Sequence, residues 1–395
     1  MSRIFIIVRD FRENSGSYSG MVEKFSKHAS KKGYKIVILC ARTSEGLASS
    51  ENLEYAEVIR FPLNSFRIAG IGMNNDYLVL AKHVKEYFSK THTEKEDIIL
   101  ANGRAALGLK GRKYILRVGQ PALYFLESLE IAKENTSLLT RAARQIHFRF
   151  QLYLERTAFR NAEAYIFSSM ESMNLNIKYY DGKRKPYFIP ISGTNYENLK
   201  STNKGRKKEK TILFISAGSG EKIRKGTIHL EQALPGIFSE YNGVSLTHVG
   251  TPFEWNLPGW CKKRINSVGR VPWSEINNYY RTSDIVVIPS LYEIIPNVLL
   301  EAMSAGGKIL VGNMCGVSEY VSHKESGYIF QRGNVESLKT GLRYFLDNPD
   351  KTKKFGSIAR KKAARISYEN YSKNLLNFLV SVNNGQKPNI NLLEG

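Results

Sequence analysis

The chain has 395 residues, of which 42% are hydrophobic and 24% are charged, and these proportions exclude a disordered or fibrous protein. They are typical of a globular protein large enough for two ordinary domains, each with its own core. The formal net charge of +22 predicts attraction to nucleic acid, an anionic membrane surface or phosphorylated substrates, and a lysine-rich solvated surface is the alternative.

No stretch approaches the length of a membrane-spanning helix, and the apolar run at 4–8 is too short for the core of a signal peptide. The three cysteines, Cys40, Cys261 and Cys315, are far apart and lack the spacing of a metal site. We therefore expect a cytoplasmic protein whose thiols are reduced and buried.

The first half of the chain alternates between strand and helix patterns. Apolar runs predict strands at 4–8, 34–40, 97–101, 114–118 and 164–168, and helical periodicity predicts helices at 18–32, 73–89 and about 138–160. Strands separated by helices of this length imply right-handed crossovers and a parallel sheet covered on both faces.

Residues 200–210 are polar, charged and free of large apolar side chains, which predicts a linker. The alternative, a nucleic-acid-binding arm, lacks aromatic residues that could stack on bases. After this segment the alternation restarts, with strands predicted at 211–216, 244–249, 285–289 and 309–311, and helices at 226–238, 273–281, 297–305, 335–346 and 368–382.

The two alternating halves predict an α/β fold with two Rossmann-like, doubly wound parallel-sheet domains and a ligand cleft at the carboxyl ends of the strands. We place the first domain at 1–195, a basic linker at 196–210 and the second domain at 211–365. The helix in the remaining segment, 366–395, is expected to return to the first domain.

Residues 292–311, YEIIPNVLLEAMSAGGKILV, place two glutamates around a helix start. Glu293 precedes Pro296, which can begin a helix at Asn297, and Glu301 lies one or two turns inside it. The free amides at the helix start form a seat for a diphosphate. Glu301 can accept from the vicinal hydroxyls of a ribose, and Glu293 from a sugar beyond the phosphates. The pattern therefore indicates a nucleotide sugar, although either acid alone would be explained as a turn cap or a solvated helix acid.

This segment resembles the donor-site signature of retaining glycosyltransferases with the two-lobed GT-B fold, family 4 (glycosyl transferases group 1). The signature has two glutamates separated by seven intervening residues, and the matching residues are Glu293, Pro296, Asn297, Leu300, Glu301, Ala302 and Met303. Further matches, which together cover most of 211–331, are Ala305, Gly306, Gly316, Glu319 and Gly327, and the base-bordering loop 268–271 with Glu275, Ile276 and Tyr280. Lys308 departs from the pattern, because the family usually has proline there.

The resemblance implies a role for each matched position. Lys225 and Glu293 are implied as the catalytic pair, with the lysine against the donor diphosphate. Ser219 stands where the family often has a second cation, an arginine, and Lys222 and Arg224 are the two alternatives for the missing charge. The implied donor-binding residues are Gly16, Gly20, Ser219, Arg270, Val271, Pro296, Asn297, Val298 and Glu301.

The first half of the chain resembles the family less closely. The segment 15–20, SGSYSG, resembles the glycine-rich loop that lies against the donor, and a flexible loop is the alternative. The segment 117–121, RVGQP, lacks the histidine that the family commonly carries at the end of this strand, so Arg117 or Gln120 is expected to meet the sugar. Glu155 belongs to a segment that resembles the one leading to the interdomain crossover.

The helix expected at about 138–160 carries five arginines against one glutamate. One stripe at helical spacing predicts a core face, made of Leu139, Ala143, Ile146, Phe150 and Leu154. On the opposite side, apolar residues lie beside arginines, namely Phe148 and Leu152 with Arg141 and Arg144. This composition predicts contact with an anionic membrane leaflet, and a helix buried on two sides is the alternative.

The expected function is transfer of a hexose from a nucleotide-diphosphate sugar to a glycan or lipid-linked acceptor, with retention and without a metal cofactor. The leaving phosphate itself is expected to take the acceptor's proton, while Lys225 and the amides near Asn297 stabilise its charge. Asp76 and Asp97 are isolated and lack a metal-ligand setting.

Two alternatives to this function remain. A weakly active or inactive nucleotide-sugar-binding relative is the first, because the family's arginine and histidine are missing. A nucleic-acid surface is the second, but no helix-turn-helix, zinc spacing or combined aromatic and basic signature supports it, and we expect no nucleic-acid partner.

Overall fold

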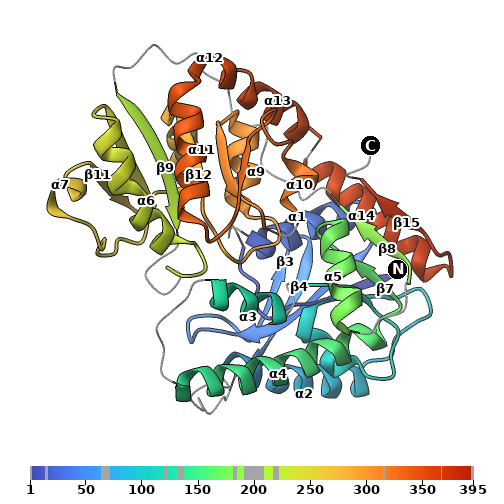
Figure 1. Cartoon of the computed structure of the whole chain (residues 1–395). Helices are drawn as coiled ribbons and strands as arrows, with labels where there is room; N and C mark the ends of the chain where they lie inside the picture. Colours follow the sequence, from blue (N-terminus) through green and yellow to red (C-terminus); the bar gives the residue numbers. More distant parts are fainter. Residues whose placement is uncertain are drawn as a thin grey trace. The chain divides into compact units, whose positions relative to one another are not determined.

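The computed structural model describes residues 2–13, 17–63, 72–119, 122–131, 138–180, 185–190, 209–216, 222–314, 316–365 and 367–392. The chain divides into two compact units (Figure 1). Unit 1 comprises Met1–Leu126, Asn135–Gly193 and Tyr368–Gly395, and unit 2 comprises Glu127–Glu134 and Thr194–Ser367.

Unit 1 contains a sheet whose described strands lie in the order β15-β8-β7-β6-β5-β1-β2-β4-β3. Neighbouring strands are parallel except β3 and β4, which pair antiparallel. The strands are β1 (Arg3–Ile7), β2 (Lys35–Arg42), β3 (Ser50–Leu53), β4 (Ala56–Pro62), β5 (Ile98–Asn102), β6 (Ile115–Arg117), β7 (Ala164–Ile166), β8 (Tyr187–Ile189) and β15 (Asn389–Asn391).

Helices cover both faces of this sheet. Successive side chains of a strand point to opposite faces, and in each central strand the side chains on both faces are apolar. In β1, Ile4 and Ile6 join one core cluster and Phe5 and Ile7 join the other. The first cluster is completed by α1 (Ser17–Lys31) and α14 (Tyr368–Asn383). The second is completed by α2 (Gly72–Lys90), the 3-10 helix η1 (Gly103–Leu109), α4 (Leu138–Asn161) and α5 (Met170–Tyr180). The remaining helix of the first half is α3 (Ala122–Ile131).

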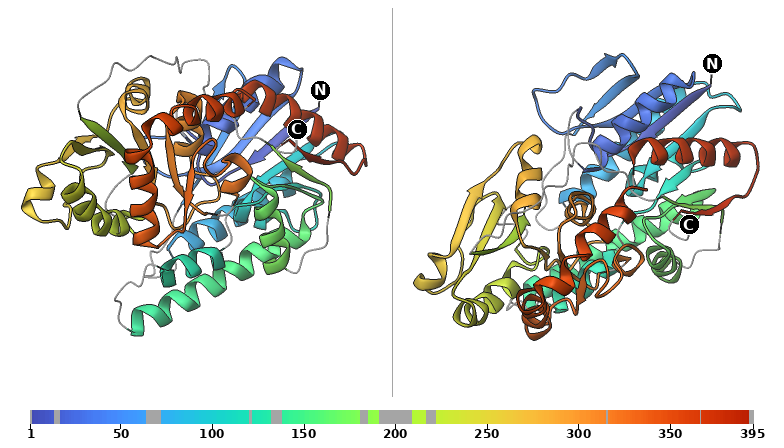
Figure 2. Two further views of the ribbon diagram at one scale, coloured as in Figure 1. Left: turned by 45° about the horizontal axis from the view of Figure 1, so that its top comes forward. Right: turned by 90° about the horizontal axis from the view of Figure 1, so that it is seen from above.

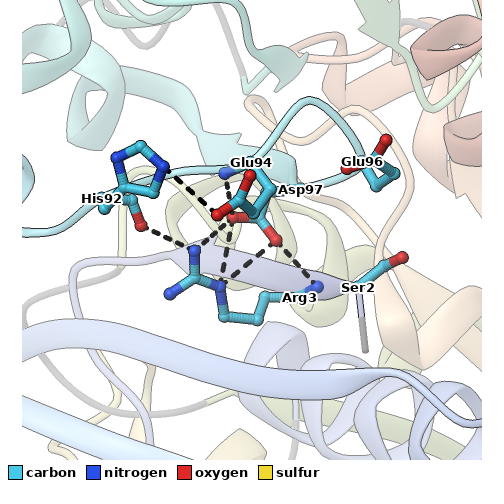
Figure 3. Close-up of a pocket in the computed structure, with 6 residues that line it drawn as sticks. All are labelled: Ser2, Arg3, His92, Glu94, Glu96 and Asp97. Carbon is cyan, nitrogen blue, oxygen red and sulfur yellow. Dashed lines mark hydrogen bonds and ion pairs between the residues drawn. The ribbon is translucent and has the colours of Figure 1, made fainter.

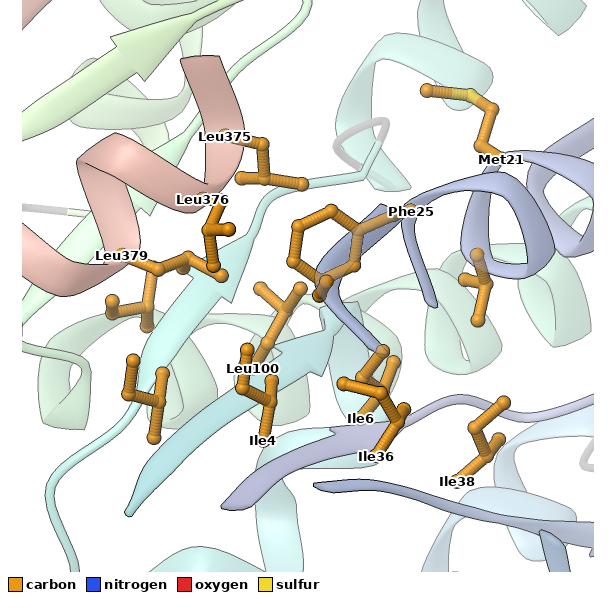
Figure 4. Packing of buried hydrophobic residues seen from close by; sticks show 14 of the residues in the cluster. Ile4, Ile6, Met21, Phe25, Ile36, Ile38, Leu100, Leu375, Leu376 and Leu379 are labelled. Carbon is orange, nitrogen blue, oxygen red and sulfur yellow. The ribbon is translucent and has the colours of Figure 1, made fainter. Parts of the chain in front are cut away.

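The last long helix of the chain is part of the core built by the first strand. Figure 4 shows Leu375 and Leu379 of α14 packed with Phe25 of α1 above Ile4 of β1 and Leu100 of β5. Figure 2 shows α14, in red, running beside the blue N-terminal elements. Burying these side chains is the reason why the chain end returns to unit 1.

Unit 2 contains a parallel sheet with its described strands in the order β11-β10-β9-β12-β13-β14. The strands are β9 (Lys210–Ser216), β10 (Val244–Gly250), β11 (Ile265–Gly269), β12 (Ile285–Ile288), β13 (Ile309–Gly312) and β14 (Tyr328–Phe330). Read along the chain, this is the doubly wound order 3-2-1-4-5-6, in which the winding direction reverses between β9 and β12. Ligands in such sheets bind at that switch point, outside the carboxyl ends of the two strands.

Helices also cover both faces of the second sheet. Two of them, α6 (Thr227–Glu240) and α11 (Val335–Asp347), bury their apolar residues in one core cluster. On the other side α8 (Trp273–Thr282) and α9 (Asn297–Ala305) contact β9 and β12, respectively. The shorter helices are α7 (Gly259–Lys262), α10 (Val317–Tyr320), α12 (Pro349–Thr352) and α13 (Phe355–Ala363).

The core stripe predicted along α4 is wrong in its first half. Ala143 is exposed, and so are 71% of Ile146 and 37% of Phe150. Phe148, predicted on the opposite side, packs on Phe125 of α3 with ring centroids 5.0 Å apart. Helical spacing identifies an apolar stripe, but it does not show which side of the helix a neighbouring element buries. Here α3 packs on the side of α4 that carries Phe148.

The second half of α4 behaves differently, because there the helix lies against the sheet. Leu154, Ala158 and Phe159 are buried, and Leu152 packs against the same core. Leu154 is therefore the one described member of the predicted stripe that lies in the core.

Asp97 is a structural residue at the amino end of the first sheet. The Arg3 guanidinium donates to both of its carboxylate oxygens, and the backbone amides of Arg3 and Glu94 donate to it as well (Figure 3). The pocket around this pair, which His92 and Glu96 also line, lies at the start of β1 and β5 and therefore at the edge opposite the expected ligand edge. Asp76 is likewise paired, since its Oδ2 lies 2.9 Å from Nη2 of Arg9.

Candidate functional site

The two segments that carry the predicted catalytic pair emerge side by side from the second sheet. β9 and β12 are hydrogen-bonded neighbours in parallel register, so their carboxyl ends lie at the same edge. Beyond β9 the chain reaches a turn at 222–226 that leads into α6, and beyond β12 a loop at 289–296 leads into α9. Both segments therefore stand at the switch point of the doubly wound sheet.

Backbone contacts join this turn and this loop. The Leu291 amide donates to the Arg224 carbonyl oxygen at 2.8 Å. Gly226 has φ of +69°, and a Cβ atom placed on it would lie 1.8 Å from the Pro289 carbonyl oxygen. Only glycine permits this conformation together with this close approach. Nη1 of Arg332 also donates to the Leu291 carbonyl oxygen, at 2.7 Å, so the positions of the side chains in both segments are set by a fixed backbone.

One carboxylate oxygen of Glu293 accepts hydrogen bonds from two cationic side chains. Its Oε1 accepts from Nζ of Lys225 at 2.5 Å and from Nη1 of Arg224 at 2.6 Å. Glu293 is only 6% exposed, and a buried carboxylate is stable only when such partners compensate its charge. Within the described part of the chain, no donor is hydrogen-bonded to Oε2. The lysine and glutamate identified from the sequence are therefore in direct contact.

Glu301 lies near the same group of charges. Its Oε2 accepts from the buried hydroxyl of Tyr280 at 2.6 Å. Burial raises the pKa of Glu301 to about 7, although the Tyr280 hydrogen bond and the positive charge of Lys225 both act to lower it. Lys225 thus interacts electrostatically with both Glu293 and Glu301. Sequence reasoning named Tyr280 only within the base-bordering loop, and no spacing pattern links it to a glutamate on the next helix.

The start of α9 has the geometry expected for an anion seat. The amides of Leu299 and Leu300 donate to the Pro296 carbonyl oxygen. Asn297 is exposed and Val298 is partly exposed, and their amides have no hydrogen-bond acceptor among the residues that the structure describes. Two backbone donors and the positive end of the helix dipole are consequently available next to the glutamates.

Other predicted donor-binding residues lie at the edge strand or outside the described ranges. Arg270 and Val271 follow β11, two strands away from β9, and Nε of Arg270 donates to Oγ1 of Thr251 at 2.8 Å. Their role towards the base stays a prediction. Gly16, Ser219, Gln120 and the cysteine at 315 lie outside the described residues, as does most of the predicted linker.

Gly20 does not lie in a loop, contrary to the expected glycine-rich segment. α1 begins at Ser17, so Gly20 is in the first turn of that helix and is buried.

Arg117 is at the carboxyl end of β6, where it has contacts within unit 1. Its guanidinium carbon lies 4.1 Å from the ring centroid of Tyr18, and its Nη1 donates to Oδ1 of Asn102 at 3.4 Å. Burial raises the pKa of Tyr371, while the charge of Arg117 and its hydrogen bond to that hydroxyl lower it. A contact between Arg117 and a sugar stays a prediction.

Glu155 has a positioning role that sequence reasoning missed. Its Oε2 accepts from the Ala122 amide at 3.0 Å and from the Tyr180 hydroxyl at 2.8 Å, and its Oε1 accepts from Nε2 of Gln151 at 2.7 Å. Burial raises the pKa of Glu155, and these hydrogen bonds oppose the rise. The carboxylate therefore fixes the first residue of α3, directly after the segment 117–121. An acid inside an otherwise basic helix was the available signal.

Lys308, the departure from the family pattern, has a structural partner. Its Nζ donates to Oγ1 of the buried Thr352 at 3.3 Å, and burial lowers the pKa of this lysine. The lysine side chain thus ties the start of β13 to α12.

Across the ranges that the structure describes, no three His, Cys, Asp or Glu side chains gather closely enough to hold a metal ion. In the same ranges, no helix has both the length and the apolar character needed to cross a membrane. Cys40 and Cys261 are buried free thiols.

Comparison with known proteins gives a family model and curated relatives that each match part of the chain. Residues 197–362 match the family model described as Glycosyl transferases group 1. An uncharacterized glycosyltransferase of Haemophilus influenzae is 32% identical over 166 residues, which are 40% of this chain and 46% of that protein. The UDP-Gal:alpha-D-GlcNAc-diphosphoundecaprenol alpha-1,3-galactosyltransferase of Escherichia coli is 33% identical over 82 residues, 20% of each chain. The chain thus spans less than half the length of the first curated relatives that it matches.

The fold is shared along the whole chain. Sucrose-phosphate synthase from Thermosynechococcus elongatus matches with a TM-score of 0.77 at 16% identity, covering 98% of this chain and 100% of that one. This likeness confirms the expected GT-B fold class, with two parallel-sheet α/β domains. Residues 197–362, the segment that matches the family model of the glycosyl transferases group 1, contain Lys225, Glu293 and Glu301.

Proposed function

We propose that this protein is a retaining glycosyltransferase that moves a hexose from a nucleotide-diphosphate sugar to a glycan or lipid-linked acceptor. The observation that carries the proposal is the convergence of Lys225, Glu293 and Glu301 on the switch point of the second sheet, beside the free first turn of α9. Cations, backbone amides and two carboxylates in one place match the phosphates and hydroxyls of such a donor.

Each group has a defined task in this proposal. Glu301 accepts from the ribose hydroxyls, and the amides of Asn297 and Val298 bind the diphosphate together with Lys225. The remaining oxygen of Glu293, Oε2, accepts from a hydroxyl of the hexose. The side chain of Tyr280 keeps Glu301 in place.

The transfer step follows from leaving-group stabilisation. The bond between the anomeric carbon and the phosphate oxygen breaks with its electron pair on the phosphate, and the acceptor oxygen forms the new bond on the same face. The acceptor's proton passes to the leaving phosphate. Lys225 stabilises the charge that develops there, as preorganised cations do in other enzymes. We expect this electrostatic route to operate without a metal ion, so turnover should survive an excess of EDTA.

A lipid-linked acceptor is the finer part of the proposal. The Escherichia coli relative is named for a UDP-Gal donor and an acceptor carried on diphosphoundecaprenol. In this chain the exposed face of α4 supports contact with an anionic bilayer, since Ile146, Phe150 and Tyr153 project from it at helical spacing with exposures of 71%, 37% and 65%. Arg149 is exposed between them. The one acid of the helix, Glu155, is bonded inward. We therefore propose that the protein is cytoplasmic and works at the inner face of the cell membrane.

Vesicle flotation tests the membrane contact. Ile146→Glu/Phe150→Glu should reduce binding to vesicles with anionic lipid and leave the weak binding to neutral vesicles unchanged. Leu78→Glu, at an exposed apolar residue of α2, is the matched control. Equal flotation of both variants and the unaltered protein would rule out a membrane-binding role for this face.

The activity is tested by a screen of nucleotide sugars. A donor that binds the folded protein raises its melting temperature, so UDP-, GDP- and ADP-sugars are first compared by thermal shift. Release of the nucleoside diphosphate in the presence of an acceptor then establishes transfer. Donor binding without turnover on any lipid-linked or glycan acceptor would favour the second candidate, a nucleotide-sugar-binding module. Absence of any donor binding would refute both.

A further inference from the structure

A buried histidine and a buried serine lie next to the switch point of the second sheet and have no task in the proposed mechanism. Ser216 is the last residue of β9, and His248 lies on the neighbouring strand β10. Oγ of Ser216 and Nε2 of His248 are 2.9 Å apart and share a hydrogen bond. The two residues are 3% and 0% exposed, respectively. Because both side chains are buried, the pair can influence a ligand only through the position of the backbone that it holds.

Aromatic side chains enclose the imidazole of His248. Its ring centroid lies 5.6 Å from that of Phe214 on β9, 4.8 Å from that of Phe253 and 5.6 Å from that of Trp255. Trp255 is itself tied to β11, since its Nε1 donates to Oγ of Ser267 at 3.3 Å. Burial lowers the pKa of His248 to about 4, so the imidazole is neutral near pH 7. The ring therefore has a fixed orientation and carries no charge.

Stability alone does not account for this pair. Among the residues that the structure describes, Nδ1 of His248 has no hydrogen-bond partner, and an unpaired buried nitrogen is destabilising. An apolar ring with an alanine opposite would fill the same space without that penalty, since replacing both partners of a buried hydrogen bond by apolar groups can be nearly neutral or stabilising. Such a replacement would lose the directional bond, which specifies one arrangement of the groups that it joins.

The bond fixes the point where the chain leaves β9. Gly250 on β10 pairs in register with Ser216 and has φ of +136°, and a Cβ atom placed on it would lie 1.6 Å from the Ser216 carbonyl oxygen. The backbone of β10 thus closes on the backbone of Ser216, while His248 holds the side chain. The chain then continues to the turn at 222–226, which carries Lys225. These contacts set the direction in which the chain leaves the sheet towards that turn.

We propose that His248 is a positioning residue for sugar transfer, which fixes the end of β9 through its hydrogen bond to Ser216 and so helps to place Lys225. This inference rests on the proposed function. Small displacements matter most for the transfer step, because the ammonium has to meet the leaving phosphate oxygen as the donor bond breaks. Donor binding depends less on this placement, since Glu301 and the amides at the start of α9 follow β12 rather than β9.

Single and double substitutions separate positioning from stability. His248→Phe and Ser216→Ala each leave one buried polar group unpaired and should lower the melting temperature. His248→Phe/Ser216→Ala removes both partners and should recover most of that loss. All three variants should nevertheless show a single-turnover rate about tenfold below normal, with donor affinity within about threefold of normal. The rate is read from release of UDP, GDP or ADP from the matching glucose donor, with the acceptors used to establish transfer.

Two further variants complete the comparison. Glutamine places an amide near the position of Nε2, so His248→Gln should recover a rate within about threefold of normal. The matched control is Ser326, which is also buried and whose Oγ accepts from the Ser322 amide at 2.9 Å. It precedes β14 and therefore lies at the edge opposite to the switch point. Ser326→Ala should destabilise the protein as Ser216→Ala does and leave the rate normal.

The outcomes distinguish this inference from the proposed function. A normal rate in the double variant would overturn the inference, and so would rates that follow the melting temperature across all the variants, Ser326→Ala included. Both results would leave the proposed function intact. If the unaltered protein binds none of UDP, GDP and ADP, or binds a donor and releases no nucleoside diphosphate with any acceptor, the transfer function itself is wrong, and this inference falls with it.

Discussion

The carboxyl edges of the two sheets use charged residues in different ways. In unit 2, Lys225 and Glu293 pair with each other, and among the residues that the structure describes the amides of Asn297 and Val298 and Oε2 of Glu293 have no hydrogen-bond partner. In unit 1, two charged residues near the corresponding edge have partners within the unit, since Arg117 contacts Tyr18 and Glu155 fixes the start of α3. The same doubly wound plan thus gives two edges with different charged contacts, and we expect ligand binding at the edge of unit 2 and a mainly structural role for Arg117 and Glu155 in unit 1.

This contrast assigns separate consequences to changes in the two units. Substitutions at the edge of unit 2 should alter binding and turnover while the protein remains folded. Substitutions at the edge of unit 1 should alter stability first. Variants at each edge can therefore show whether this division holds.

Lys225→Ala should lower the single-turnover rate by about a hundredfold to a thousandfold, the range for losing one group that stabilises developing charge. Donor affinity should fall less, because the amides of α9 still bind the diphosphate. Rapid-quench measurement with a saturating donor separates these effects. Lys222→Ala, on the same turn but bonded to the Glu254 carbonyl oxygen, should retain the normal rate. An unchanged rate for Lys225→Ala would remove this residue from the mechanism.

Glu301→Ala should weaken donor binding by about tenfold or more, because a buried charged acceptor for the ribose is lost. Tyr280→Phe removes one hydrogen bond to the same carboxylate and should cost about fivefold. Calorimetry with a ribonucleotide donor and its 2′-deoxy analogue checks the assignment. The preference for ribose should shrink in Glu301→Ala, and a preference that stays constant would mean that another group reads the sugar.

Glu155→Gln should destabilise the protein by about 1–3 kcal/mol, since a neutral amide is a weaker acceptor for Ala122 and Tyr180 and presents an N–H where an oxygen is needed. Denaturant unfolding measures the change. If unit 1 has the structural edge described above, affinity for nucleoside diphosphate should be preserved in this variant. A loss of affinity without a loss of stability would contradict the division between the units.

The regular elements were the most predictable part of the structure. Helix 297–305 was located to the residue, because proline marks its start and Gly306, in the left-handed conformation, marks its end. Short elements were not predicted, since brief runs carry little periodicity. Examples are the strands β3 and β14 and the helices α3, α5, α7, α10, α12 and α13.

The site was predictable where one segment carried it. Glu293 and Glu301 lie in a single motif, and Lys225 follows a buried strand. The contacts of Arg224 and Tyr280 depend on which strands become neighbours and on side-chain direction. The spacing of residues within one segment predicts neither the strand order nor the side-chain direction. The same limit explains the error on α4, where the position of α3 decided which stripe of that helix is buried.

The pKa of Glu301, about 7, predicts opposite effects of pH on binding and on stability. Only the ionised carboxylate accepts fully from ribose hydroxyls, so donor affinity should fall by up to about tenfold as the pH is lowered from 8 to 6. Stability should respond the other way. Because the folded-state pKa of this acid lies above its ordinary value of 4.5, the folded protein binds more protons than the unfolded chain between these two values, and this residue stabilises the fold as the pH falls through that window.

Glu301→Gln isolates both effects, because an amide does not titrate. The difference in melting temperature between Glu301→Gln and the unaltered protein should therefore change between pH 7 and pH 5, in the direction of greater relative stability for the unaltered protein at pH 5. Donor affinity in the variant should be flat between pH 8 and pH 6. If both proteins show the same pH dependence of affinity, the titrating group belongs elsewhere. The contrast between the two edges would then have to be explained without an acid in unit 2 that is poised near neutrality.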